Sequence, residues 1–140
     1  MLFEKIEKDS KGIVFVYTTC AGIGEARAIA FSAIENKLAI SADYWLVNSI
    51  YPWKNVIQDI DQHMIMFATE KDLSDKLIKH IETEHSYDVP MIVKTDTAIT
   101  NQAYSFWVES TLSSKDKYIT EEEERKMKKK KEEFHLEKLK

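Results

Sequence analysis

The stretch Glu84-His85-Ser86-Tyr87-Asp88-Val89-Pro90-Met91-Ile92 decides the fold, because it joins a predicted helix to a predicted strand. Upstream of it, apolar residues recur at helical spacing over residues 73–81, which predicts an amphipathic helix. Pro90 restricts the residue before it to extended geometry, so this helix has to end before that point. The apolar run 91–93 then predicts a short strand that is buried on both faces.

An imidazole and a phenol, those of His85 and Tyr87, lie in the turn between these two elements, which is where a functional site is expected. His80 precedes His85 by five residues and points about 140° away from it around a helix, so the two cannot form a chelating pair. The local sequence favours a helix-end role for His85, with its ring hydrogen-bonded to the turn, over a dedicated metal ligand.

The beginning of the chain predicts a strand followed by a helix. Residues 13–19 are rich in β-branched and aromatic side chains, as in a strand. Over residues 25–37, alanine and isoleucine recur on one face, which predicts a helix lying close against a sheet. Gly22 and Gly24 lie between the two elements. They lack the third glycine and the Gly-Lys-Ser/Thr ending of a phosphate-binding loop, so we interpret them as a plain turn.

The middle of the chain predicts a long β-hairpin. Residues 38–51 and 57–68 form its strands, and the apolar part of the second strand fits a central position in a sheet. The turn is Pro52-Trp53-Lys54-Asn55, in which Asn55 is suited to a left-handed conformation.

Three further features complete the predicted elements. Thr69 with Asp72 predicts a capping box at the start of the second helix. Residues 96–100 predict a loop or a short edge strand. A third helix is expected over residues 101–112, burying four side chains: Tyr104, Trp107, Val108 and Thr111.

The element order is therefore β-α-β-β-α-β followed by a helix, which predicts an α+β, ferredoxin-like fold with an antiparallel sheet and helices on one face. The second and third strands carry apolar and aromatic residues along their length. A sheet with one uncovered apolar face and open edges needs a partner, so an oligomer is expected.

The composition changes after residue 112. Thr120 followed by four glutamates is a good helix start, and lysines lie toward the other end, where the helix dipole favours cations. Apolar residues in this segment are too sparse to bury a face. We divide the chain into a ferredoxin-like domain, residues 1–112, and a charged helical or flexible tail, residues 113–140, for which coiled-coil association is an alternative.

Composition excludes several classes of protein. The 140 residues carry a net charge of −4, and residues 115–140 carry +2, so the remainder carries −6. An acidic body argues against nucleic acid as a partner. There is no apolar run long enough to span a membrane, and residues 1–11 lack the apolar core of a secretory signal. Cys20 is the only cysteine, which excludes an intramolecular disulfide and favours a reduced, cytoplasmic setting.

His85, Tyr87 and Pro90, in the pattern His-x-Tyr-x-Val-Pro, resemble the signature turn of the CutA family, the divalent-cation-tolerance proteins. Other segments resemble the family in the same order over about residues 13–112: Val16-Tyr17-Thr18-Thr19, Asn36-Lys37-Leu38-Ala39, Ser49-Ile50-Tyr51 with Trp53, and Asn101, Tyr104 and Trp107. The resemblance implies a homotrimer with the sheets of three subunits packed together, no catalysis, and a role in tolerance of divalent cations such as copper.

The chain also departs from the family pattern. Some members carry a cysteine at the position of Thr18 and many carry one at Ser41, so thiolate binding of a soft metal at these two positions is impossible here. Cys20 lies two residues from Thr18, and we do not predict it as a substitute ligand. Further polar positions of the family are changed at Lys54, Asn55, Ala68 and Met91.

Two functions follow as expectations. The first is weak binding of a divalent metal, of the copper type, by His85 at an intersubunit cleft lined by aromatic residues: Tyr51, Trp53, Tyr87, Tyr104 and Trp107. The alternative is a trimeric scaffold or signalling module, similar in fold to PII proteins, with an unidentified protein or small-molecule partner and no dedicated metal site. An enzyme is not expected, because no nucleophile–base motif is present and the carboxylates of Asp59 and Asp61 are typical of a solvated strand.

Overall fold

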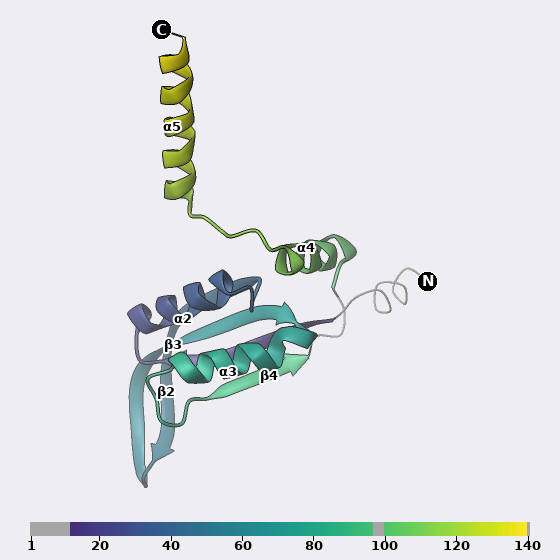
Figure 1. Cartoon of the computed structure of the whole chain (residues 1–140). Coiled ribbons are helices and arrows are strands. Elements are labelled where there is room, and N and C mark those ends of the chain that lie inside the picture. Colours follow the sequence, from purple (N-terminus) through teal and green to yellow (C-terminus); the bar gives the residue numbers. More distant parts are fainter. Residues whose placement is uncertain (1–11, 97–99, 140) are drawn as a thin grey trace.

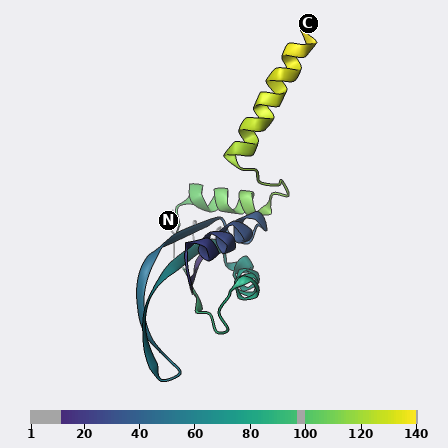
Figure 2. The same cartoon turned by 90° about the vertical axis from the view of Figure 1, so that its left-hand side faces the viewer.

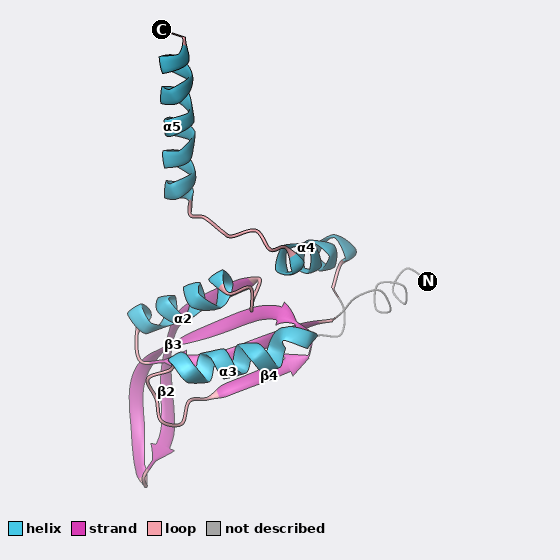
Figure 3. Cartoon of the chain, in the orientation of Figure 1, coloured by secondary structure: helices cyan, strands magenta, loops and turns pink. Residues whose placement is uncertain are grey.

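A computed structural model describes residues 12–96 and 100–139 of the chain. In chain order, its elements are β1 (Ile13–Cys20), α2 (Ile23–Glu35), β2 (Ser41–Trp53), β3 (Val56–Glu70), the short 3-10 helix η1 (Lys71–Leu73), α3 (Ser74–Glu84), β4 (Ile92–Asp96), α4 (Gln102–Ser113) and α5 (Glu121–Lys138). Figure 3 shows this mixture of helices and strands. The expectation for residues 1–11 and part of the loop predicted over 96–100 lie outside the described residues.

The four strands form one antiparallel sheet in the order β2-β3-β1-β4. Helices α2 and α3 lie side by side on one face of this sheet (Figure 1). Their apolar residues pack with those of the two central strands into the main core, which includes Val16, Ile29, Phe67, Leu77 and Ile81. The predicted ferredoxin-like arrangement is confirmed. None of the helices among the described residues is long and apolar enough to cross a membrane.

Helix α4 covers one end of the opposite face of the sheet, where no helix was predicted. Its Val108 and Leu112 pack with Ile13 and Ala68 in a second, smaller core. Of the four side chains expected to be buried, Val108 is buried, while Tyr104 and Thr111 are half-buried. Trp107 is 51% exposed, so the prediction for it is wrong within one chain. The helix has only a short stretch of sheet to lie on, so its outer side stays in solvent.

Strand β4 was predicted to be buried on both faces, and the structure contradicts this. It is an edge strand that pairs with β1 alone. Ile92 packs against the main core, whereas Val93 on the other face is 48% exposed. An apolar run of three residues does not distinguish a central strand from an edge strand whose outer face lacks a cover within the chain.

The hairpin of β2 and β3 extends well beyond the two helices, as Figure 1 shows. Pro52 and Trp53 belong to β2, and the turn consists of Lys54 and Asn55 alone. Both have positive φ angles, 49° and 65°. The left-handed conformation predicted for Asn55 is confirmed, and Lys54 adopts it as well, as the common two-residue hairpin turn requires.

Lys54 is therefore in a conformation that costs an ordinary L-residue about 1–2 kcal/mol, while asparagine tolerates it. We expect Lys54→Asn to raise the free energy of unfolding by about 1 kcal/mol, measured by urea denaturation. Lys54→Ala removes the same side chain but keeps the left-handed strain, so it should bring no such gain. Equal effects of the two substitutions would contradict the explanation.

The predicted capping box of Thr69 and Asp72 is wrong. Thr69 belongs to the end of β3, is fully buried, and donates a hydrogen bond from Oγ1 to the carbonyl oxygen of Leu38 at 2.7 Å. The chain then passes through η1, and the Ser74 hydroxyl at the start of α3 donates to the carbonyl of Lys71 at 2.7 Å. The Thr69 hydroxyl thus provides a hydrogen bond to a backbone carbonyl in the segment between α2 and β2, and it does not cap a helix.

The charged tail begins with an extended linker and continues as α5, which projects away from the rest of the molecule (Figure 2). The predicted cap is confirmed, since the backbone N–H of Glu123 donates to Oγ1 of Thr120 at 3.2 Å. Lys37 fixes the linker to the domain: its Nζ lies 3.6 Å from the centre of the Tyr118 ring and donates to the carbonyl of Thr111 at 3.4 Å. Helix α5 has no buried residue.

Candidate metal centre

His85 is the residue that ends α3, and its ring is buried. The backbone N–H of His85 still donates to the carbonyl of Ile81, and its own backbone is extended. Nε2 donates to the carbonyl oxygen of Thr19 at 2.7 Å, and Nδ1 accepts from the backbone N–H of Tyr87 at 3.2 Å. The predicted hydrogen bond to the turn is confirmed. These two bonds define a neutral ring with its proton on Nε2.

Cys20, the last residue of β1, lies beside this ring. Its Sγ is 4.0 Å from Nε2 of His85, and its side chain is fully buried. Burial, together with the nearby charge of Glu25, raises the pKa of the Cys20 thiol from 9.0 to about 12. In the absence of a metal, the sulfur is therefore a neutral thiol.

Glu25, in the first turn of α2, contacts the other nitrogen of the same ring. Its Oε1 lies 3.4 Å from Nδ1 of His85 and accepts the backbone N–H of Ser86 at 2.9 Å, while Oε2 accepts the Ser86 hydroxyl at 2.8 Å. Burial alone would raise the pKa of the Glu25 carboxyl, but the hydrogen bonds from the backbone and side chain of Ser86 lower it below its ordinary value. Glu25 is thus a carboxylate held against the turn.

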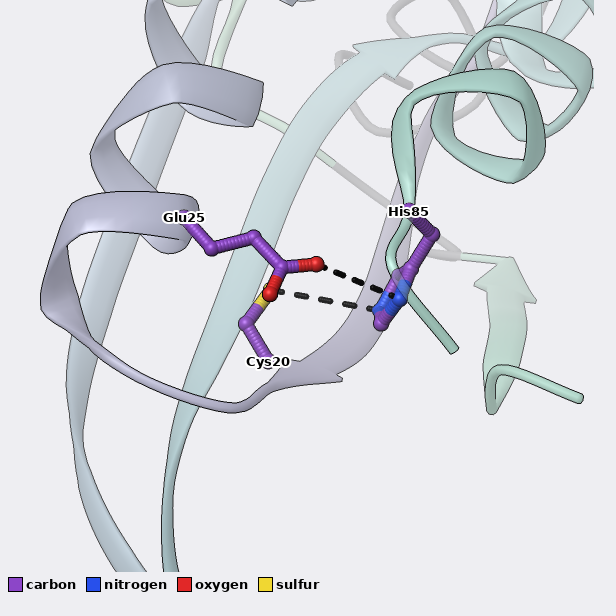
Figure 4. Close-up of side chains that lie close together, drawn as sticks. All are labelled: Cys20, Glu25 and His85. Carbon is purple, nitrogen blue, oxygen red and sulfur yellow. Dashed lines mark hydrogen bonds and ion pairs between the residues drawn. The ribbon is translucent and has the colours of Figure 1, made fainter. Parts of the chain in front are cut away.

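The three residues form one cluster, shown in Figure 4. One ligand atom from each of Cys20, Glu25 and His85 lies within 4.8 Å of the others, and no other such group of three occurs among the described residues. Sulfur, imidazole nitrogen and carboxylate oxygen together suit a borderline-soft cation, and three protein ligands leave a position open. The hydroxyl of Thr18, buried on the same face of β1 two residues before Cys20, has no hydrogen-bond partner. Such an oxygen is a place where a bound ion or its water could be accommodated.

Tyr87 lies between the His85 ring and strand β3 and contacts both. Its ring lies 4.8 Å from the His85 ring, and its hydroxyl donates to Oε1 of the buried Gln62 at 3.1 Å. Burial, with the phenol of Tyr51 as the next contribution, raises the pKa of Tyr87. The Tyr87 hydroxyl therefore ties the turn that holds His85 to β3.

The structure separates the remaining aromatic residues of the predicted cleft from His85. Trp53 lies at the tip of the hairpin, next to the turn. The rings of Tyr104 and Trp107 are 5.9 Å apart on α4, at the opposite end of β1 from Cys20. Within one chain, the Tyr87 ring contacts the His85 ring, and Tyr51 is near enough to Tyr87 to contribute to its pKa. His80 is also separate, since its Nε2 contacts Ser32 Oγ at 2.7 Å and Glu84 at 3.2 Å.

Sequence reasoning did not assign Cys20 and missed Glu25. The two are 60 and more residues from His85, and only the pairing of β1 between β3 and β4 brings them to the end of α3. A weak signal was present, because Glu25 falls in the first helical turn after the strand that ends at Cys20. No spacing rule links that turn to a histidine beyond the next two strands.

The order sulfur, imidazole, carboxylate is also that of a cysteine-dependent catalytic group. The environment does not favour that chemistry, because the active species of such a group is an exposed thiolate. Cys20 is buried and its pKa is raised, and the Nε2 proton of His85 is engaged by Thr19.

A change of the thiol pKa from 9.0 to about 12 reduces the thiolate fraction at neutral pH about 10³-fold. We therefore expect Cys20 in the folded chain to react with iodoacetamide at least about 10²-fold more slowly than in the same chain unfolded by guanidinium. Because Cys20 is the only cysteine, mass spectrometry reads this rate without ambiguity. Similar rates in the two states would show that the sulfur is exposed and ionised.

The fold and the cluster define a class of protein: a small ferredoxin-like chain with one largely uncovered sheet face and a cluster of thiol, imidazole and carboxylate at the end of its second long helix, α3. The sequence pattern of the family described as CutA1 divalent ion tolerance protein matches residues 14–111. The chain belongs to this CutA1 family.

Individual relatives agree with this assignment. The divalent-cation tolerance protein CutA of Thermococcus kodakarensis is 30% identical over 99 residues, which cover 71% of this chain and 95% of the relative. The chloroplastic protein CutA of Arabidopsis thaliana is 24% identical over 110 residues, but the chain covers only 60% of it. The crystal structure of CutA1 from Ehrlichia chaffeensis superposes with a TM-score of 0.71 at 28% identity, covering 74% of this chain and 97% of that one.

Proposed function

We propose that this chain is a non-enzymatic, divalent-cation-binding member of its family and that Cys20, Glu25 and His85 hold the ion. The observation that carries the proposal is the convergence of three different ligand atoms within 4.8 Å at the end of α3. The names of its relatives, which refer to tolerance of divalent cations, support the same reading. The sulfur makes zinc and copper better candidates than magnesium or calcium, which prefer oxygen ligands alone.

The same contacts explain why binding should be weak. His85 donates through Nε2 and accepts at Nδ1, so either nitrogen has to give up a hydrogen bond before it binds an ion. Cys20 has to lose a proton that its burial retains. Glu25 is already a carboxylate and needs no deprotonation. Affinity should therefore rise with pH, because binding releases the thiol proton.

The decisive test is calorimetric titration of Zn²⁺ and Cu²⁺ into the metal-free protein, with particle mass measured in the same buffer. We expect saturable binding of one ion per chain, weakened by at least about tenfold in His85→Ala and in Cys20→Ser. His80→Ala is the matched control, since His80 lies on the same helix but contacts Ser32 and Glu84 instead. Equal binding by wild type and both site variants would place the ion elsewhere.

We propose that the protein assembles as a homotrimer in the cytoplasm. The support is the sheet face opposite α2 and α3, which α4 covers only at one end and which otherwise presents exposed apolar residues such as Trp45 and Val93. Cytoplasmic reducing conditions would keep Cys20 as a thiol. Nucleic acid and membranes are not among the proposed partners, because the domain is acidic.

The second candidate function is a trimeric scaffold or signalling module without a metal site. The burial and raised pKa of Cys20 favour it, because they oppose formation of the thiolate ligand. In this case the titration would show an oligomer with no saturable binding, and the cluster would serve only to fix the turn after α3.

A further inference from the structure

Helix α5 is ordered along 18 residues although none of them is buried. A free helix of this length is only marginally stable in water, and its residues include a run of like charges. Its own support includes the Thr120 cap and two exposed ion pairs, Glu122 with Lys126 at 3.1 Å and Glu124 with Lys128 at 3.2 Å. Near its end, Nζ of Lys138 lies 4.9 Å from the centre of the Phe134 ring. Exposed contacts of this kind contribute little.

The residues of α5 have a periodicity that singles out one side of the helix. Thr120, Met127 and Phe134 recur every seven residues, and Met127 and Phe134 are more than half exposed. Between them, alternating steps of three and four residues place Glu123, Lys130 and Glu137 on the same side, as in the seam of a coiled coil. One flank of this seam then carries Glu124 and Lys131, and the other carries Lys126 and Glu133.

We propose that α5 pairs in antiparallel orientation with α5 of a second copy of this chain. In that orientation the seam residue Met127 packs against the stem of Lys130 of the second copy. Glu124 then faces Lys131 of the second copy on one flank, and Lys126 faces Glu133 of the second copy on the other. Two-fold symmetry repeats each contact, so four opposite-charge pairs flank the seam.

A parallel pair is less complementary, since it matches only Glu133 with Lys138 of the second copy. It would place Glu123 against Glu123 of the second copy and Lys130 against Lys130, and it would bring Lys126 near Lys131. Like charges facing one another are destabilising. Each flank carries charges of both signs, Glu124 before Lys131 and Lys126 before Glu133, and this order favours the antiparallel orientation.

The fold leaves α5 free for this contact. The helix points away from the domain, as Figure 2 shows, and Lys37 contacts both α4, at the carbonyl of Thr111, and the linker, at the ring of Tyr118. If several chains assemble through their domains, their α5 helices are presented together, and this raises the effective concentration for pairing between two particles. The contact itself does not depend on the metal cluster or on the number of domains in a particle.

Charge reversal on the flanks of the full chain tests the proposal. Glu124→Lys with Glu133→Lys makes both flanks basic, and Lys126→Glu with Lys131→Glu makes both acidic, so each double variant repels itself. A mixture of the two restores every opposite-charge pair. The control is Glu122→Lys with Glu132→Lys, on the side of the helix away from the seam. It changes the net charge by the same amount as Glu124→Lys with Glu133→Lys. Like that variant, it also removes a first-turn glutamate and one intrahelical ion pair.

Sedimentation velocity reads the particle mass and circular dichroism the helix content. We expect wild type and control to have about twice the mass of either flank variant, an equimolar mixture of the two variants to regain it, and high salt to reduce it. A wild-type mass equal to that of both flank variants would overturn the proposal. Co-sedimentation of wild type with anionic phosphatidylserine vesicles, without any change of mass in the flank variants, would assign the helix to a membrane surface instead.

Discussion

Phe67→Ala should lower the free energy of unfolding by about 3–5 kcal/mol, a large part of the stability of an ordinary domain. Phe67 is the largest fully buried side chain among the described residues, and it lies on the central strand β3 in one core with residues of α2 and α3. Its removal leaves a cavity that two helices and a four-stranded sheet cannot close, because the sheet fixes the backbone on one side. Urea denaturation followed by circular dichroism measures the loss.

Phe31→Ala is the control for this prediction. Phe31 is on the outer side of α2, half exposed, with the Arg27 guanidinium 5.3 Å from its ring centre. Its substitution should cost no more than about 1 kcal/mol, the contribution of an exposed cation–π contact. Comparable losses for the two phenylalanines would show that the core is not where the structure places it.

Much of the fold could be predicted because most of its helices and strands can be recognised from the local sequence. The strand after Gly12, the alanine-rich helix and the end of α3 before Pro90 need only short windows of sequence. The errors arose where a segment distant in the sequence determines the hydrogen-bond partner or the burial of a residue. Thr69 has the sequence context of a helix cap, but its hydroxyl donates a hydrogen bond to the carbonyl of Leu38 instead. Val93 belongs to an apolar run, but nothing on the outer side of β4 covers it within the described chain.

The site was only partly predictable for the same reason. The turn around His85 carries its own signature, and its hydrogen bond to Tyr87 is local. Cys20 and Glu25 reach His85 through strand order and helix packing, which no spacing in the sequence encodes. The aromatic residues of the predicted intersubunit cleft are not all brought together within one chain. Tyr104 and Trp107 look equivalent to Tyr87 by type, yet they lie on α4 at the far end of β1.

The uncovered face of the sheet leads to the second large effect. Side chains alternate along β1, so if Thr18 and Cys20 face the helices, Thr19 faces the other way. Its cross-strand neighbours on that face are Met64 and, beyond it, Trp45. Trp45 is 44% exposed in the single chain. A tryptophan on a sheet face that needs a partner is the kind of residue that dominates association energy.

We expect Trp45→Glu to convert the assembly into single chains, as measured by light scattering during size-exclusion chromatography. The substitution removes apolar area and places an unpaired charge in the contact, which together cost several kcal/mol per interface. Phe31→Glu introduces the same charge on the outer side of α2 and should leave the mass unchanged. If Trp45→Glu kept the wild-type mass, the sheet face would not be the interface. The exposed α4 side chains Phe106 and Trp107 would then be the next surface to substitute.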